Sequence, residues 1–196
     1  MNKEERTYSW KTHAKILSEL DFATAKRVAD IGCGQGKFFD ALKDINPAAK
    51  MFGIEADRQE AAKARAKGYT VVEPKKLASL GKGFDFVVMT EVIEHLSLGE
   101  LCNYLSWAKS ALKAGGWLAI STPNTNNIYM LYSFWDSEDH VRPYSDQAMR
   151  NLAEKFGFDY VKTAGVNNWA NPRKVFVNLL LGMENSCNKI YFLRKK

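Results

Sequence analysis

Three glycines at alternate positions follow an apolar segment near the start of the chain. Residues 28–36 read Val-Ala-Asp-Ile-Gly-Cys-Gly-Gln-Gly, and the glycines are Gly32, Gly34 and Gly36. Glycine tolerates a positive φ and lets a ligand lie against the main chain. The free N–H groups at the start of a following helix favour a polar or negative group. The pattern therefore predicts a buried strand, a sharp turn and a binding loop for a nucleotide-like cofactor.

Two carboxylates accompany this loop. Asp30 stands just before the first glycine, and Glu55 ends the apolar segment 50–55. A dinucleotide loop would read G-x-G-x-x-G, with an acidic residue about twenty positions further on. The spacing here is G-x-G-x-G, which argues against NAD. Glu55 is placed to accept both hydroxyls of a ribose, and its negative charge disfavours a 2′-phosphate.

A second group of chemically active residues lies in the middle of the chain. Glu91, Glu94 and His95 have the spacing i, i+3 and i+4, which places them on nearly one face if the segment is helical. With His140 they form a set that suits Mg²⁺, Mn²⁺ or Zn²⁺. The same residues without a metal would shape a pocket in which His140 is the general base. We adopt the metal-free interpretation and assign no metal ligand.

The pattern of apolar segments predicts the elements that position these residues. A helix is expected over 8–22, followed by strands near 27–31, 50–54, 69–72, 84–89 and 116–121 with helices between them. Such alternation implies right-handed crossovers and a parallel sheet that helices cover on both faces. A capped helix over 145–156, a strand near 158–164 and a last strand at 188–193 complete the expected order. Residues 175–183 are markedly apolar and fit a helix or a hydrophobic surface.

Length and composition set limits on the class of protein. A chain of 196 residues with 46% hydrophobic content suits one domain, here residues 1–196. No apolar run is long enough to span a membrane and no signal-peptide core follows the polar start, so we expect a cytoplasmic protein without stable membrane insertion. Three cysteines without C-x-x-C spacing indicate neither a disulfide framework nor a zinc knuckle. The net charge of +6 permits nucleic acid as a partner without indicating it.

Four segments taken in order resemble the class I S-adenosylmethionine-dependent methyltransferases, and most closely the small members of type 11/12. The resemblance covers most of the chain. It implies a Rossmann-like, doubly wound α/β fold with a mostly parallel seven-stranded sheet whose last strand is antiparallel. It also implies S-adenosylmethionine as the cofactor and S-adenosylhomocysteine as the product. The four segments are the glycine loop 30–36, the acidic strand end 53–55, the stretch 84–96 and the run 112–124.

The resemblance also assigns roles to single residues. Asp30 and the loop glycines would hold the amino-acid end of the cofactor, and Glu55 would bind its ribose. Glu73 falls near the position that contacts the adenine, although the family usually has Asp or an amide there. Thr90 and Glu91 would line the methionine pocket. The helix within residues 1–25 would close over the cofactor as a lid.

The methyl acceptor is expected to bind at an insert over residues 123–145. Its His-Val-Arg-Pro-Tyr sequence at 140–144 resembles a signature of type 11/12 enzymes that act on small molecules, lipids or sugars. This implies His140 as a base or substrate ligand, with His95, Arg142 and Tyr144 as further substrate contacts. The resulting prediction is O-methylation of a small-molecule, glycan or lipid-linked acceptor.

Two alternatives remain open at this point. The Glu-x-x-Glu-His run also resembles the metal site of small-RNA 3′-terminal 2′-O-methyltransferases, with Thr122-Pro-Asn124 and Asp139-His140 as further matches. In that case a metal would bind both terminal ribose hydroxyls. The chain could instead be a non-catalytic S-adenosylmethionine-binding module. The oligomeric state does not follow from the sequence.

Overall fold

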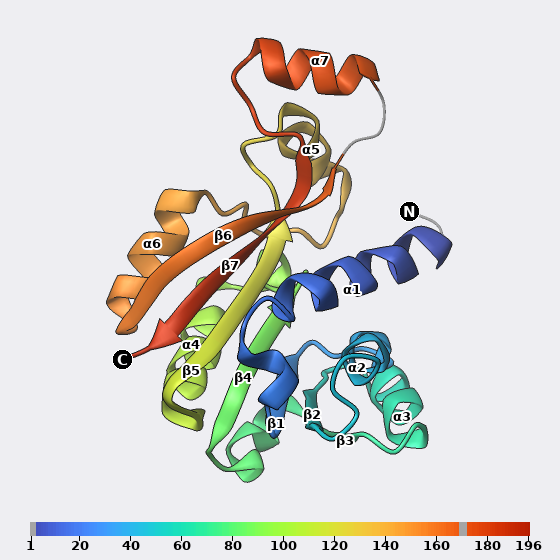
Figure 1. Ribbon diagram of the computed structural model, residues 1–196, viewed down its shortest axis with the longest axis vertical. Coiled ribbons are helices and arrows are strands. Elements are labelled where there is room, and N and C mark those ends of the chain that lie inside the picture. Colours follow the sequence, from blue (N-terminus) through green and yellow to red (C-terminus); the bar gives the residue numbers. More distant parts are fainter. Residues whose placement is uncertain (1–2, 169–171) are drawn as a thin grey trace.

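The computed structural model describes residues 3–168 and 172–196 (Figure 1). Strands and helices alternate from the first strand up to the fourth helix, as the apolar pattern predicts. The elements in chain order are α1 (Lys3–Leu17), η1 (Asp21–Thr24), β1 (Arg27–Ile31), α2 (Lys37–Lys43), β2 (Lys50–Ile54), α3 (Arg58–Ala66), β3 (Thr70–Val72), η2 (Pro74–Leu80), β4 (Phe84–Thr90), η3 (Ile93–His95), α4 (Leu98–Ala111), β5 (Leu112–Pro123), α5 (Ile128–Ser133), η4 (Phe134–Asp136), α6 (Asp146–Lys155), β6 (Phe158–Asn168), α7 (Pro172–Leu180) and β7 (Ser186–Lys195).

The strands form one seven-stranded sheet in the order β3-β2-β1-β4-β5-β7-β6. Pairing is parallel from β3 through β5, whereas β7 runs antiparallel to both β5 and β6. This confirms the predicted Rossmann-like sheet with its antiparallel last strand. The strand order reverses between β1 and β4, and ligands of open α/β sheets bind outside the carboxyl ends of the strands at such a point.

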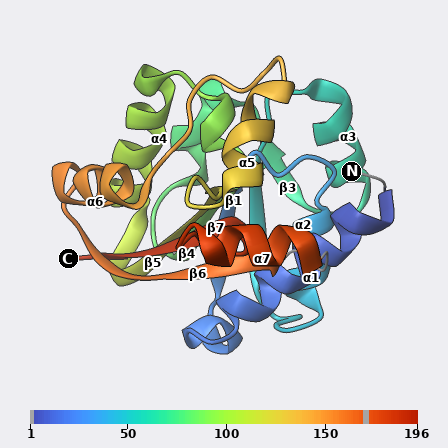
Figure 2. The same cartoon turned by 90° about the horizontal axis from the view of Figure 1, so that it is seen from above.

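Helices cover both faces of the sheet, and two apolar layers fill the space between (Figure 2). The alternation of side chains along β1 shows the division, since Val28 faces the layer under α1 and α2 while Ala29 and Ile31 face the layer under α4 and α6. Burial on both faces explains why the central strands read as continuous apolar runs.

Local sequence signals set several helix ends. Ser97 and Glu100 form a reciprocal capping box at the start of α4. Ser145 caps α6 through a bond from the Ala148 N–H, and Gly157 follows the helix with a φ of 70°. The helix expected over 145–156 is therefore confirmed.

The N-terminal helix differs from the expected range 8–22. It ends at Leu17, and the chain then turns through η1 so that Phe22 enters the core. The Phe22 ring meets Phe86 of β4 edge-on, with ring centroids 5.4 Å apart.

The strand expected at 116–121 is also longer than predicted. β5 starts at Leu112 and takes Gly115 and Gly116 into the strand, with a register irregularity opposite Phe84 and Phe86. At its other end β7 pairs with β5 as far as Pro123. Among the helices of the described residues, none is long and apolar enough to cross a bilayer.

Candidate functional site

The glycine loop forms the turn between β1 and α2. Gly32, Gly34 and Gly36 all have positive φ values, of 77°, 50° and 73°. A Cβ on Gly32 would lie 2.4 Å from a methyl of Val92, and one on Gly36 would lie 2.8 Å from the Tyr69 ring. Glycine is therefore required at both positions, by backbone conformation and by close packing.

Asp30 lies under this loop with almost no solvent exposure. Its Oδ1 is buried and has no hydrogen-bond partner within the described part of the chain. Burial, and then the charge of Glu55, raise the pKa of Asp30 well above its ordinary value. An unpaired buried carboxylate oxygen at a binding loop fits a cationic ligand group, because such a group would satisfy the oxygen and favour its ionised form.

Glu55 leaves β2 and braces the same loop. Its Oε2 accepts a hydrogen bond from the Gly34 N–H and its Oε1 accepts one from the Asp57 N–H, both at 2.8 Å. Each carboxylate oxygen can accept more than one hydrogen bond. The side chain can therefore hold the glycine loop and still accept the hydroxyls of a ribose.

A cleft of about 180 Å³ opens beside the loop. It brings together four of the predicted cofactor residues with Trp10 of α1; the four are Asp30, Gly32, Gly34 and Thr90. The Trp10 ring packs on Phe38 of α2, with centroids 5.8 Å apart. The cleft is thus lined by the polar side chains of Asp30 and Thr90, by the backbone of the glycine loop and by the Trp10 ring of α1.

The other four predicted cofactor residues do not belong to the described lining of this cleft; they are Gly36, Glu55, Glu73 and Glu91. Glu73 pairs with Lys75 at 2.9 Å and with Arg58 at 3.8 Å, and its bond from Lys75 lowers its pKa. Its adenine contact remains a prediction. Gly36 acts at the start of α2, where it allows the close approach of Tyr69.

Glu91 occupies a bend directly after β4. Its φ of 54° is the single positive value at a described residue other than glycine. Such backbone is held only where the surroundings determine it, and here hydrogen bonds from Ser121 and Asn188 hold the carboxylate. His13 of α1 lies 2.8 Å from Ser121 through its Nε2. This network connects α1 to the carboxyl end of the sheet.

The expected helical face for Glu91, Glu94 and His95 is not present. The chain bends at Glu91 and continues as the single turn η3, so these residues do not share an α-helix. The carboxyl group of Glu94 nonetheless comes close to both predicted histidines. One ligand atom from each of Glu94, His95 and His140 lies within 4.8 Å of the others. The insert folds back over η3, where the Val141 N–H donates to the Glu94 carbonyl at 2.7 Å. This contact brings His140 close to Glu94 and His95.

The carboxyl group of Glu94 is buried and accepts a side-chain hydrogen bond from Thr122. Its side chain is 1% exposed, and Thr122 Oγ1 donates to it at 3.2 Å. Burial raises the pKa of Glu94, and the nearby charge of Glu91 raises it further. Burial also raises the pKa of Glu91. Both groups therefore favour either a proton or a cation near them.

Backbone carbonyls orient the two imidazoles. His140 Nδ1 lies 2.7 Å from the Phe134 carbonyl oxygen, and His95 Nδ1 lies 3.2 Å from that of Asp139. A carbonyl only accepts, so the Nδ1 atoms carry the protons and each neutral ring keeps its lone pair on Nε2. In His95 the side chain of Asp139 supports the same tautomer from 3.2 Å.

Arg142 and Tyr144 lie in different environments. The Arg142 side chain is exposed, with its guanidinium 5.6 Å from the centre of the Tyr144 ring. Tyr144 is 1% exposed in the core beneath it, and its hydroxyl has no hydrogen-bond partner among the described residues. A direct contact between Tyr144 and an acceptor stays a prediction.

Ser121 and Asn188 are site residues that the sequence analysis did not identify. Both lie far along the chain from Glu91, on β5 and β7, and no local motif marks them. The pairing of β5 with β4 places Ser121 beside Glu91, and the pairing of β7 with β5 adds Asn188.

The class of protein follows from the fold and from comparison with known proteins. The model of a family described as methyltransferase domain matches residues 3–163, and the chain belongs to this family. A S-adenosylmethionine-dependent methyltransferase from Archaeoglobus fulgidus has the same fold, with a TM-score of 0.75 at 22% identity over 98% of this chain and 97% of that one. A magnesium protoporphyrin IX methyltransferase from Synechocystis, solved with bound S-adenosylhomocysteine, gives a TM-score of 0.68 at 16% identity, over 97% of this chain and 84% of that one.

Two relatives with similar sequences are named as O-methyltransferases. A ubiquinone biosynthesis O-methyltransferase from Rhizobium rhizogenes is 30% identical over 123 residues, which are 59% of this chain and 48% of that protein. One from Cereibacter sphaeroides is 32% identical over 108 residues, 51% of this chain and 42% of that protein. The chain thus spans about half the length of these relatives. The family match identifies the chain as a methyltransferase domain, and the unpaired Asp30 oxygen beside the glycine loop suits a ligand with a cationic group.

Proposed function

We propose that this enzyme methylates a hydroxyl oxygen of a small-molecule, glycan or lipid-linked acceptor, with His140 as the general base. The observation that carries the proposal is the Nδ1 bond of His140 to the Phe134 carbonyl, which leaves Nε2 as the proton acceptor. The similarity to O-methyltransferases supports oxygen as the acceptor atom. A hydroxyl must lose its proton during attack, so a fixed base has a clear role.

The residues around the cleft supply binding and orientation. S-adenosylmethionine, when bound, supplies an electrophilic methyl group and leaves as S-adenosylhomocysteine. Asp30 would pair with its ammonium group, Glu55 would accept its ribose hydroxyls, and Thr90 would line its methionine end. Trp10 of α1 would exclude water from the reacting groups, which strengthens the alignment on which a direct displacement depends.

Methyl transfer from labelled S-adenosylmethionine to a panel of catechols, phenols and sugars tests this proposal. We expect an O-methylated product with at least one acceptor and a fall in kcat of about 10²- to 10⁴-fold in His140→Ala, the range for loss of a general base. The control is His140→Gln, which keeps a side chain of similar length but cannot act as a base. Unchanged kcat in both variants, or methylation at nitrogen alone, would contradict the proposal.

A metal-assisted 2′-O-methylation of RNA 3′ ends is a second candidate that one observation favours. Glu94, His95 and His140 offer a carboxylate and two imidazoles within 4.8 Å, a donor set that suits a divalent cation. The carbonyl contacts of both Nδ1 atoms resemble the outer contacts that orient metal-bound histidines. In this case His140 would be a ligand, and a cation would lower the pKa of the acceptor hydroxyl.

Titration with Mn²⁺ separates the two candidates. Saturable Mn²⁺ binding that is lost in His95→Ala, together with methylation of a short RNA only when its 3′-terminal diol is intact, would establish the second candidate. Activity on a small hydroxyl acceptor that is unchanged by chelator would establish the first. RNA binding should also weaken steeply with salt if RNA is the acceptor.

A further inference from the structure

Four polar side chains from separate parts of the sequence form one hydrogen-bonded group at the carboxyl end of the sheet. We call this group the polar chain, and its members are His13 of α1, Glu91 after β4, Ser121 of β5 and Asn188 of β7. His13 and Ser121 are 1% and 2% exposed. A buried polar group that loses its partner costs stability. The polar chain is therefore satisfied while α1 rests against the sheet.

The hydrogen bonds of the polar chain have a defined direction. Ser121 donates its single hydroxyl proton to the Glu91 carboxylate, which also accepts from Asn188. The Ser121 oxygen then accepts from His13 Nε2, which lies 2.8 Å away. His13 Nε2 also lies 3.9 Å from Glu91 Oε1. A donor on α1 thus reaches the carboxylate at the end of β4 through a hydroxyl of β5.

His13 lies on the face of α1 that packs against the protein. Trp10, His13, Ala14 and Leu17 have the spacing i, i+3, i+4 and i+7, which places them on one helical face. Ala14 and Leu17 belong to the apolar core, and Trp10 packs against it while partly exposed. His13 is the polar member of this face. Its bond to Ser121 therefore holds the turn of α1 that carries Trp10.

Both ends of the polar chain adjoin the cofactor cleft. Trp10 lines the cleft one helical turn before His13, and the two ring centroids are 6.1 Å apart. Thr90 lines the cleft directly before Glu91. The bend at Glu91 is also held through the backbone, since its N–H donates to the Ser121 carbonyl at 3.0 Å. A shift of the polar chain would thus move two walls of the cleft.

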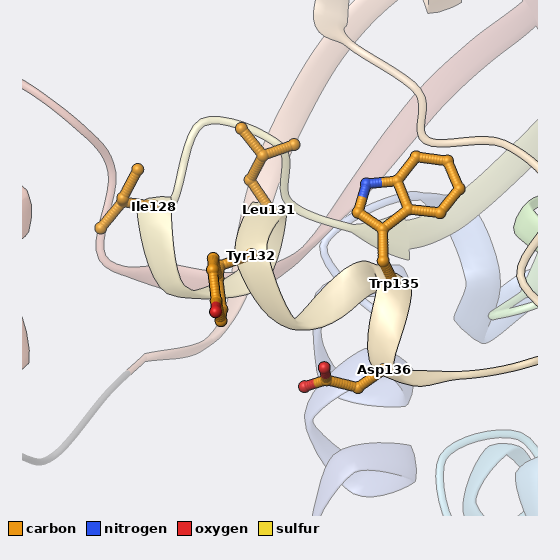
Figure 3. A pocket seen from close by; sticks show the side chains of 5 residues that line it. All are labelled: Ile128, Leu131, Tyr132, Trp135 and Asp136. Carbon is orange, nitrogen blue, oxygen red and sulfur yellow. The ribbon is translucent and has the colours of Figure 1, made fainter.

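A larger cavity, of about 440 Å³, lies on α5 and η4 (Figure 3). No member of the polar chain and no residue of the glycine loop lines it. Its lining consists of Ile128, Leu131, Tyr132, Trp135 and Asp136. The polar chain is therefore next to the cofactor cleft and not part of this cavity.

The carboxylates of Glu91 and Asp30 differ in what they offer a ligand. Both oxygens of Glu91 accept from the protein, Oε1 from Ser121 and Oε2 from Asn188. Asp30 Oδ1, in contrast, has no partner within the described residues. Asp30 thus has an acceptor to give to a ligand, whereas the Glu91 carboxylate holds neighbouring elements of the protein together.

We propose that His13, Ser121 and Glu91 are positioning residues for S-adenosylmethionine, which hold α1 so that Trp10 forms one wall of the cofactor cleft. Asn188 keeps the Glu91 carboxylate in place from β7. These residues act without touching the cofactor. A wall that is already in place strengthens binding, because less of α1 has to be ordered when the cofactor enters. The proposal rests on the part of the proposed function that concerns the cofactor, and it is independent of the acceptor.

Calorimetric titration with S-adenosylhomocysteine tests the proposal. We expect His13→Ala and Ser121→Ala to bind about tenfold more weakly than the wild type, the effect of one hydrogen bond to a charged group. His13→Gln should recover most of the affinity, because its amide can also donate to Ser121. The control is Lys15→Ala, an exposed residue of α1 outside the packed face, which should bind as the wild type does. Urea unfolding shows which variants are folded, and Ser121→Ala carries the test if His13→Ala is not.

A double-mutant cycle with Trp10 separates positioning from a general loss of structure. We expect Trp10→Ala to weaken binding, and His13→Ala to cause no further loss in the Trp10→Ala background, because His13 acts through that ring. A full further loss of about tenfold in that background would overturn the proposal. Wild-type affinity in both His13→Ala and Ser121→Ala would also overturn it and leave the cofactor site intact. A wild type that does not bind S-adenosylhomocysteine would overturn the cofactor site as well.

Discussion

Replacing Glu94 by glutamine should change how the stability of the protein depends on pH. The carboxyl group of Glu94 is 1% exposed, and burial together with the Glu91 charge raises its pKa in the folded state. Between the ordinary pKa of a glutamate and this raised value, the folded state binds more protons than the unfolded state. The free energy of unfolding therefore falls as pH rises through this window, and stability is greatest at its acid end.

The magnitude follows from the linkage relation. Within this window the folded state holds up to one proton more than the unfolded state. The free energy of unfolding then falls by up to about 1.4 kcal/mol for each pH unit. Between pH 5.5 and pH 7.5 the wild type should lose up to about 2.7 kcal/mol from this group alone. Glutamine resembles the protonated carboxyl and does not ionise, so Glu94→Gln avoids the loss. Titrating groups that do not interact with Glu94 are common to both proteins and cancel in the difference.

Urea unfolding at pH 5.5, 6.5 and 7.5 with a chelator present measures this difference. We expect Glu94→Gln to be close to the wild type at pH 5.5 and more stable by about 1 to 3 kcal/mol at pH 7.5. The control is Glu154→Gln on α6, which replaces an exposed glutamate. We expect its difference in stability from the wild type not to increase with pH. A stability difference between Glu94→Gln and wild type that stays constant over this range would refute the reasoning.

Three further predictions concern the loop and the core. Gly32→Ala should lose about 1 to 3 kcal/mol in urea unfolding and weaken cofactor binding, because its φ is 77° and its Cβ would lie 2.4 Å from Val92; wild-type affinity would contradict this. Asn46→Ala should cost about 1 to 3 kcal/mol, since Nδ2 donates to two buried carbonyls at 2.9 Å; a neutral effect on the melting temperature would count against these bonds. Lys189→Met should cost about 1 to 2 kcal/mol, because it leaves two partner carboxylates without their cation while water screens both, since they are 34% and 45% exposed; a more stable variant would show that the apolar replacement is preferred.

Much of the fold could be predicted from apolar runs and glycine positions. The alternation of strands and helices up to β5 is encoded locally, and Ser145 with Gly157 marks α6 in the sequence. The resemblance also implied seven strands with an antiparallel last strand, whereas the order of the strands came from the structure. The end of α1 was wrong, because burial of Phe22 against Phe86 is a tertiary contact that no local signal reveals.

Part of the candidate site could likewise be predicted from the sequence, and part could not. Asp30, Gly32, Gly34 and Thr90 meet in one cleft because the carboxyl ends of β1 and β4 are neighbours. The spacing of Glu91, Glu94 and His95 suggested one helical face, but the positive φ at Glu91 breaks that geometry. Their approach to His140 depends on the fold of the insert. Sequence reasoning could name these residues but not the geometry that brings them together.

The most direct test of the cofactor site is a calorimetric titration of S-adenosylhomocysteine into the wild type, Glu55→Ala and Glu19→Ala. Glu55 braces the Gly34 N–H and is proposed to accept the ribose hydroxyls, whereas Glu19 pairs with Lys162 outside the cleft. We predict saturable binding to the wild type and Glu19→Ala, and at least about tenfold weaker binding to Glu55→Ala, which corresponds to about 1.4 kcal/mol. Equal affinity in all three proteins, or no binding to the wild type, would contradict the account of this site.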